Sequence, residues 1–216
     1  ITIGGKDITS TDAAKRGISM VFQSYALFPH LNVRENILFG LKVRKIKKGE
    51  RERRLEEATS LVGLNELLNR KPVQLSGGQR QRVALARTIV SQQPVCLMDE
   101  PLSNLDAKLR AQMRNEIREL QQQLGLTVLY VTHDQTEAMT MADQVILLCN
   151  GKIEQTGTPE DLYEMPETVF TAKFIGNPPM NIFPSDIFGE NNSSPSNGHS
   201  HIGIRPEHIE ICKKGI

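Results

Sequence analysis

The feature that most constrains the fold is a series of short apolar runs separated by helical patterns. Val95–Met98, Thr127–Val131 and Gln144–Leu148 are rich in β-branched residues and hydrophobic on both faces, as buried parallel strands are. Ile18–Phe22 is a further candidate of the same type. Strands that alternate with helices favour an α/β fold built on a doubly wound sheet.

One helical pattern lies between two of these runs. Residues 106–124 place apolar side chains three or four positions apart, so that they share one face of a helix: Leu109, Met113, Ile117, Leu120 and Leu124. Asp106 is suited to cap the start of this helix, and Gly125 is suited to end it.

The stretch from about residue 24 to residue 90 has no convincing strand and several helical patterns. One helix is predicted to begin near Asn32, and another to run from Glu50 to Val62. The second carries the oppositely charged pairs Glu50/Arg54 and Arg53/Glu57 one turn apart, which we interpret as a solvated face. We therefore expect an all-helical subdomain inserted into the α/β core.

The C-terminal part has a different character. Asn150-Gly151 lies between Val145–Cys149 and Lys152–Gln155 and predicts a β-hairpin. Residues 190–201 are polar and rich in Gly, Pro, Ser and Asn, as mobile linkers are, and residues 202–211 then resume an apolar alternation. We expect one domain at 1–176, and a linker with the start of a second, β-rich domain at 177–216. The two histidines His199 and His201 could hold a metal weakly, but a solvated linker is the simpler interpretation.

Charge and hydropathy argue against several classes of protein. The 26 Lys and Arg residues nearly balance the 25 Asp and Glu residues, which is unlike a surface that coats nucleic acid. No uncharged apolar run approaches the ~18 residues of a membrane span, and the first residues lack the pattern of a signal peptide. The three cysteines are far apart, which favours a reduced, cytosolic compartment over a disulfide framework or a zinc site.

The most distinctive local motif is Leu75-Ser76-Gly77-Gly78-Gln79-Arg80-Gln81-Arg82, which opens a predicted helix. Two glycines before a helix allow backbone N–H groups to approach an anion, and the helix start adds about half a positive charge. Ser76 could add a hydroxyl donor and Gln79 an amide. Ser-Gly-Gly alone is more often only a turn with an N-cap, but the full octet favours a helix start that contacts phosphate.

Acidic residues end the second predicted strand. Asp99 and Glu100 follow Val95–Met98 at the carboxyl end of that strand, where open α/β sheets carry their sites. Asp99 is suited to hold Mg²⁺, and Glu100 is suited to accept a proton from an attacking water. An isolated Asp-Glu pair could be two solvated acids, but Pro101 and the following Ser103–Asp106 make that interpretation less favourable.

Two more polar residues end neighbouring strands. His133 follows Thr127–Val131 and is a candidate to contact a γ-phosphate and the attacking water, although a lone histidine there is more often structural. Gln23 stands where the chain leaves Ile18–Phe22 for the helical stretch. A single glutamine at this position does not by itself indicate a function. As a hinge residue, Gln23 could sense Mg²⁺ or the γ-phosphate.

In this order the motifs resemble those of the nucleotide-binding subunits of ATP-binding cassette (ABC) transporters. The matches are Gln23 (the Q-loop), Leu75–Gln79 (the signature), Val95–Glu100 (Walker B and the following glutamate), Ser103–Asp106 (the D-loop) and His133 (the switch histidine). Three further stretches are similar to importers of the maltose and glycerol-phosphate type: Val21–Asn36, Thr132–Val145 and, in their C-terminal regulatory OB-like domain, Gly203–Ile209.

The resemblance implies a P-loop NTPase-like core, ATP and Mg²⁺ as cofactors, and a head-to-tail homodimer. It implies that Glu100 and His133 are catalytic, that Gln23 and Asp99 lie at the metal, and that ATP is also contacted by Ser76, Gly77, Gly78, Gln79 and Asp106. It further implies that permease subunits dock near Tyr25–His30, and that the protein lies at the cytoplasmic face of the inner membrane without nucleic acid.

One departure from the family is large. No G-x-x-x-x-G-K-[ST] pattern occurs in the 216 residues, and Gly4-Gly5-Lys6-Asp7 does not have its spacing. Because every downstream motif is intact, we expect a chain truncated at both ends, with the phosphate-binding loop upstream of its start. Two other hypotheses stay open: a soluble ABC-type ATPase of DNA repair or translation, and a non-catalytic interaction module.

Overall fold

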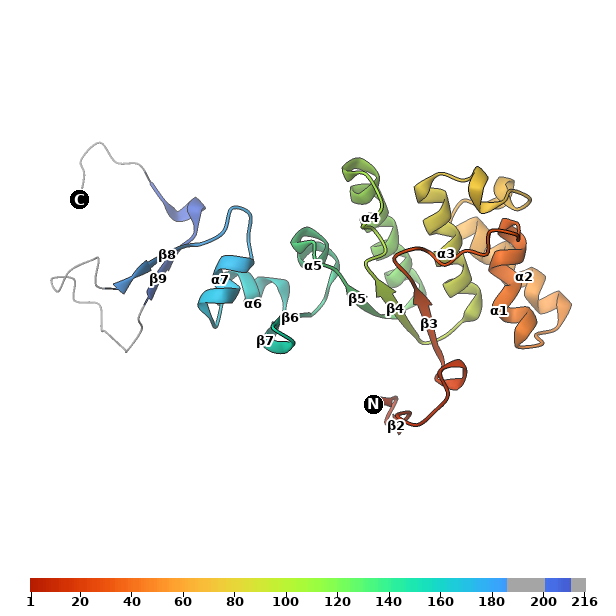
Figure 1. The fold of residues 1–216 in the computed structure, drawn as a ribbon, viewed down its shortest axis with the longest axis horizontal. Helices are drawn as coiled ribbons and strands as arrows, with labels where there is room; N and C mark the ends of the chain where they lie inside the picture. Colours follow the sequence, from red (N-terminus) through yellow and green to blue (C-terminus); the bar gives the residue numbers. More distant parts are fainter. Residues whose placement is uncertain (186–200, 211–216) are drawn as a thin grey trace. The chain divides into compact units, whose positions relative to one another are not determined.

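The computed structural model describes residues 1–185 and 201–210, and these divide into two compact units, Ile1–His133 and Asp134–Ile216. The first unit contains strands and helices in mixed order (Figure 1). They are β1 (Thr2–Ile3), β2 (Lys6–Asp7), β3 (Ile18–Val21), α1 (Val33–Val43), α2 (Lys48–Leu61), α3 (Gly77–Ser91), β4 (Val95–Asp99), α4 (Ala107–Leu124) and β5 (Thr127–Val131). Short 3₁₀ turns lie at Ala13–Lys15 (η1), Asn65–Leu67 (η2) and Pro72–Gln74 (η3).

A three-stranded parallel sheet in the order β3-β4-β5 is the frame of the first unit (Figure 1). In its register Ile18 lies beside Val95, and Val95 beside Thr127. All three strands therefore end at the same edge of the sheet. This arrangement confirms the predicted α/β fold, including the strands at 18–22, 95–98 and 127–131.

Helices alone fill the stretch between β3 and β4, as the sequence predicted. The apolar faces of α1, α2 and α3 form one buried cluster: Val33, Ile37, Leu38, Leu41, Leu55, Ala58, Val62, Leu64, Leu75, Val83, Ala86 and Val90. Asn32 caps α1 in a capping box with Glu35, because each side chain accepts a hydrogen bond from the other residue's backbone N–H. Burial of this cluster, more than helix propensity, stabilises the three helices.

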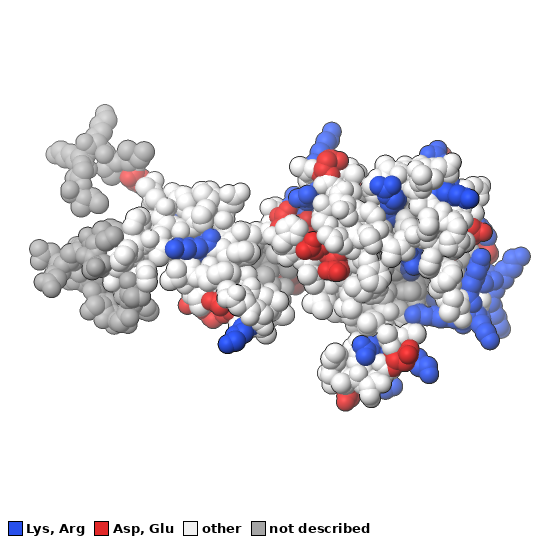
Figure 2. Space-filling view, viewed as in Figure 1, with Lys and Arg blue, Asp and Glu red and all other residues white. Residues whose placement is uncertain are grey.

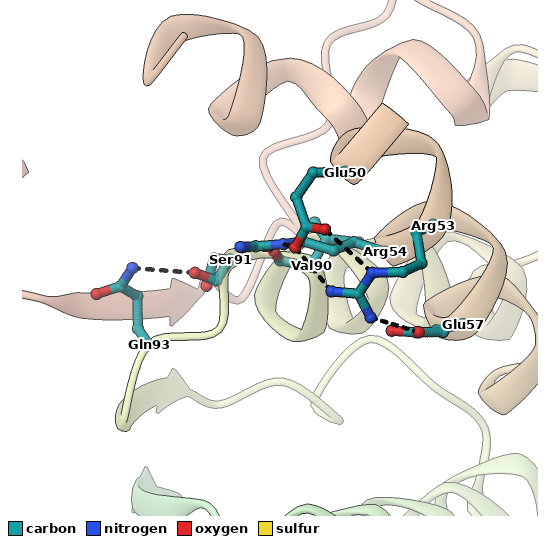
Figure 3. Close-up of polar contacts among 7 residues, drawn as sticks. All are labelled: Glu50, Arg53, Arg54, Glu57, Val90, Ser91 and Gln93. Carbon is teal, nitrogen blue, oxygen red and sulfur yellow. Dashed lines mark hydrogen bonds and ion pairs between the residues drawn. The ribbon is translucent and has the colours of Figure 1, made fainter. Parts of the chain in front are cut away.

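The charged face of α2 is joined to the end of α3 by a guanidinium group (Figure 3). Arg54 donates to Glu50 over 2.6 Å and to the carbonyl of Val90 over 3.3 Å. Arg53 bridges Glu50 and Glu57 on the exposed side. The last carbonyls of a helix lack partners within it, so Arg54 satisfies one of those of α3 from a neighbouring helix.

Positive charge gathers where α1 meets α2. Five cations occupy residues 42–48, and all five are exposed: Lys42, Arg44, Lys45, Lys47 and Lys48. Figure 2 shows this concentration of Lys and Arg at the right of the view, over the ends of α1 and α2.

Two predicted strands are less buried than the sequence suggested. In β5 the side chains of Leu129 and Val131 are 55% and 52% exposed, because β5 is an outer strand of the three-stranded sheet. The run Gln144–Leu148 is not a buried parallel strand. It forms β6 (Val145–Cys149), which pairs antiparallel with β7 (Lys152–Gly157) and leaves Leu148 60% exposed.

The second unit is built from small elements. It contains α5 (Gln135–Met141), the β6–β7 hairpin, α6 (Pro159–Glu164), α7 (Val169–Phe174), β8 (Asn181–Pro184), β9 (His201–Ile204) and the 3₁₀ turn η5 (Pro206–His208). The predicted turn Asn150-Gly151 joins β6 to β7, with both residues at positive φ. The antiparallel pairing of β8 with β9 gives the C-terminal part the strands predicted for it.

Arg205 holds the end of the second unit in place. Its side chain is buried and donates to the carbonyls of Ile175 and Tyr163, and its guanidinium lies 4.0 Å from the centre of the Tyr163 ring. These contacts tie the segment after β9 to α6 and to the end of α7. Of the predicted linker 190–201, His201 is the first residue of β9, whereas residues 190–200, with His199, lie outside the described residues, as do residues 211–216, with Cys212.

No helix among the described residues has the length and apolar character needed to cross a bilayer.

The ion pairs of Glu50 with Arg53 and Arg54 make a pH-dependent contribution to stability. Hydrogen bonds from Arg53 and Arg54 lower the pKa of Glu50 to about 2, from an ordinary value of 4.5. The stabilisation is therefore present above pH 4.5 and is lost as the pH falls toward 2. We predict that Glu50→Gln lowers the melting temperature near neutral pH, and that the difference from the wild type shrinks below pH 4.5.

Thermal unfolding followed by circular dichroism over a pH series tests this. Glu56→Gln is the matched control, since Glu56 is exposed on the same helix and its carboxylate has no ion pair among the described residues. A difference in melting temperature that stays constant with pH would contradict the assignment.

Candidate functional site

Three side chains meet at the edge where the parallel strands end. Gln23 follows β3, Glu100 follows β4 and His133 follows β5. The amide nitrogen of Gln23 donates to Oε2 of Glu100 over 3.0 Å, and Nδ1 of His133 lies 3.1 Å from Oε1 of the same carboxylate. One carboxylate therefore joins residues from three strand ends, which are far apart in the sequence.

Glu100 adopts a backbone conformation that side chains rarely take. Its φ is +42°, in the left-handed region, and such residues cluster where the surrounding structure holds them for function. The Glu100 N–H donates to the carbonyl of Val131 over 2.9 Å, and the Glu100 carbonyl accepts from the Ser103 hydroxyl over 2.9 Å. These bonds on both sides fix the direction of the carboxylate.

Asn104 also contributes to the site, which the sequence motif did not indicate. Its side-chain amide donates to the backbone carbonyl of Gln23 over 2.8 Å. The loop after β4 thus holds Gln23 by its backbone while Glu100 holds it by its side chain. The one sequence signal for a role of Asn104 is that it lies in the motif Ser103–Asp106.

Asp99 and the histidine remain open to solvent. Asp99 is the last residue of β4, is exposed, and makes no side-chain hydrogen bond or ion pair to the rest of the described chain. The His133 side chain is 72% exposed, whereas the Glu100 side chain is 29% exposed. The carboxylate of Glu100 is thus the sheltered centre of the cluster, and Asp99 and His133 face outward.

The predicted phosphate-contacting residues form a separate local unit. Ser76 and Gln79 make a capping box at the start of α3, in which each side chain accepts a hydrogen bond from the backbone of the other. Neither side chain bonds to Gln23, Glu100 or His133. The N-cap that the sequence left as an alternative is therefore present, and it leaves the first backbone N–H groups of α3 free of helical partners.

The glycines of this motif are explained by close packing. A Cβ on Gly77 would lie 3.1 Å from Leu105, and a Cβ on Gly78 would lie 3.2 Å from Leu109, at the start of α4. Asp106 caps α4, accepting from the Leu109 N–H over 3.0 Å, as predicted. The starts of α3 and α4 are therefore packed directly against each other.

Comparison with known proteins identifies the family. Residues 1–103 match the family described as "ABC transporter". The chain is 54% identical over 211 residues to the sn-glycerol-3-phosphate import ATP-binding protein UgpC 2 of Rhizobium johnstonii, with 98% of this chain and 61% of that protein covered. This chain belongs to the ABC transporter family.

Other ABC relatives agree with this assignment. The oligosaccharides import ATP-binding protein MsmX of Bacillus subtilis is 59% identical over 181 residues, covering 84% of this chain and 50% of that protein. A solved structure, cbiO1 of Clostridium perfringens, described as part of the ABC transporter complex cbiONQ, has a TM-score of 0.64 at 29% identity and covers 70% of this chain and 61% of that one. The chain spans about three fifths of the length of the curated UgpC relatives it matches.

The capping box at the start of α3 can be tested on its own. We predict that Ser76→Ala lowers the free energy of unfolding by about 1 kcal/mol, because the N-cap hydroxyl is lost. Ser76→Asn is expected to retain most of that stability, since asparagine caps equally well. Chemical denaturation gives both values, and equal stability of Ser76→Ala and wild type would show that the cap contributes nothing.

Proposed function

We propose that this chain acts in an ABC importer as the subunit that binds and hydrolyses ATP, and that hydrolysis powers uptake of a sugar or glycerol phosphate. The observation that carries the proposal is the contact of Gln23 and His133 with one sheltered carboxylate, Glu100, at the end of a parallel sheet. The import proteins to which the chain is similar support the choice of transport over a repair ATPase or a non-catalytic module.

In the proposed reaction Glu100 accepts a proton from water, and the oxygen of that water attacks the γ-phosphorus of ATP. The bond between the γ-phosphorus and the oxygen that links it to the β-phosphate breaks, which gives ADP and phosphate. His133, whose Nδ1 lies 3.1 Å from Oε1 of Glu100, would hydrogen-bond the γ-phosphate. Catalysis of this kind depends on position and electrostatics, which suits a carboxylate held by its neighbours and its backbone.

The residues fit a magnesium ion bound together with the nucleotide. Asp99 offers an exposed, unpaired carboxylate, and the amide nitrogen of Gln23 is engaged with Glu100, which leaves its amide oxygen for a cation. Mg²⁺ at nucleotide sites takes one or two protein ligands of this kind together with phosphate oxygens. When bound, the ion would neutralise charge on the phosphates.

The proposal includes partners. Two copies would pair head to tail, so that the start of α3 in one copy, with Ser76, Gly77, Gly78 and Gln79, faces the nucleotide held by the other, and Asp106 lies at the same interface. Free N–H groups and the helix dipole at that start suit an anion. Permease subunits would dock near Tyr25–His30, which places the chain at the cytoplasmic face of the membrane. The ABC resemblance and the complex named for cbiO1 support this.

We predict that Glu100→Gln preserves ATP binding and lowers turnover by about 10²–10⁴-fold, because the amide keeps the shape of the side chain and cannot accept the proton. The gene product in full, reconstituted with its permease subunits in liposomes, is assayed for phosphate release, nucleotide binding and uptake of glycerol 3-phosphate and oligosaccharides. Glu119→Gln, an exposed change on α4, is the control. Phosphate release close to wild type in Glu100→Gln would overturn the role of Glu100.

A further inference from the structure

The segment that follows Gln23 has an unusual backbone. Tyr25 and Ala26 have φ values of 64° and 44°, so two consecutive residues with side chains lie in the left-handed region. Such a conformation costs free energy and persists only when its surroundings hold it. Tyr25 is also buried, at 6% exposure, and its hydroxyl has no hydrogen-bond partner among the described residues.

Arg87 holds this segment from α3. Its guanidinium donates to the carbonyl of Ala26 over 2.6 Å and lies 5.3 Å from the centre of the Phe28 ring. Burial lowers the pKa of Arg87, and its side chain has no acidic partner among the described residues. Arg87 is a half-buried cation whose contacts are the carbonyl of a residue at positive φ and an aromatic face, so it is placed to hold that carbonyl.

Asn36 holds the same segment from α1. The side chain is fully buried, its Oδ1 accepts from the Phe28 N–H over 2.8 Å, and its Nδ2 lies within 3.1 Å of the carbonyls of Phe28, Leu31 and Asn32. The Phe28 ring lies against Phe39 of α1, with 4.4 Å between ring centres. The segment is therefore fixed to both helices beyond Ala26.

Its other end is fixed to the candidate site. Gln23 donates to Glu100 through its side chain and accepts from Asn104 through its backbone. Only Ser24 and Tyr25 separate Gln23 from the residue that Arg87 holds. The Gln23 position and the Arg87 contact are therefore connected by a very short stretch of backbone.

We infer that Arg87 and Asn36 are positioning residues that keep segment 25–28 in its strained form and so transmit displacements of Gln23 to the helical subdomain. The inference rests on the proposed function for its consequence, which is coupling of ATP hydrolysis to import. Neither residue touches the nucleotide in the proposed reaction, so their loss acts on the coupling and spares the chemistry.

The functional test uses the reconstituted importer. Arg87→Met is expected to retain phosphate release within about twofold while substrate imported per ATP falls at least about fivefold, since a charge-assisted hydrogen bond is lost. Arg87→Lys keeps the charge without the planar group, and its ratio of substrate imported per ATP is expected to lie between those of wild type and Arg87→Met. Asn36→Asp, which keeps the acceptor and loses the donors, should reduce the same ratio. Arg118→Met on α4 is the control.

A second measurement is independent of transport. The chain has three tyrosines, and 3-fluorotyrosine gives each a ¹⁹F resonance, with that of Tyr25 assigned by Tyr25→Phe. In the wild type a soluble paramagnetic quencher should leave the Tyr25 signal sharp, because the side chain is buried. In Arg87→Met the signal should broaden, while Arg118→Met leaves it unchanged.

Each outcome of these two experiments either supports or overturns the positioning role. A lower import ratio with retained hydrolysis, together with broadening of the Tyr25 signal, supports the inference. A proportional loss of hydrolysis and import, an unchanged ratio, or failure of both Arg87→Lys and Arg87→Met to fold would overturn it, as a merely structural role gives those results. If the wild-type complex imports nothing, the proposed function fails, and an unaltered Tyr25 signal in Arg87→Met is then needed to reject the positioning role.

Discussion

Parallel pairing of β3, β4 and β5 is the constraint on which the rest of the first unit depends. Because the strands run in the same direction, the residues that follow them emerge at one edge of the sheet. Gln23, Glu100 and His133 are then within hydrogen-bond reach without any local sequence relation. The helices between the strands are free to vary in length, since each connection only has to return the chain to the opposite edge, where the next strand begins.

The site combines a rigid centre with exposed surroundings. Glu100 is fixed through its backbone by Val131 and Ser103 and through its side chain by Gln23. Its left-handed φ is part of this design, because an ordinary extended residue at that position would turn the side chain elsewhere. Asp99, one residue earlier, remains open to solvent and to a ligand. Two adjacent acids thus meet different environments, which is what allows them different chemistry.

Much of this could be predicted from the sequence, and the failures have physical causes. The strands, the helical insert, the caps Asn32 and Asp106 and the hairpin follow local rules of pattern and turn chemistry. The prediction of a buried parallel strand at 144–148 is wrong because an apolar run does not specify its partner strand, and the Asn-Gly turn that follows pairs the run antiparallel with β7. The roles of Asn104, Arg87 and Asn36 depend on contacts over long sequence distances or on buried loop carbonyls, which no local pattern encodes.

The bare backbone at Gly77 and Gly78 has a mechanical consequence. Leu105 and Leu109 lie against these glycines at distances that no side chain could fill without moving something. The starts of α3 and α4 are therefore in direct contact, so a shift of one start would press on the other. A movement of α3 would therefore act directly on Leu105, which lies in the same loop as Ser103 and Asn104.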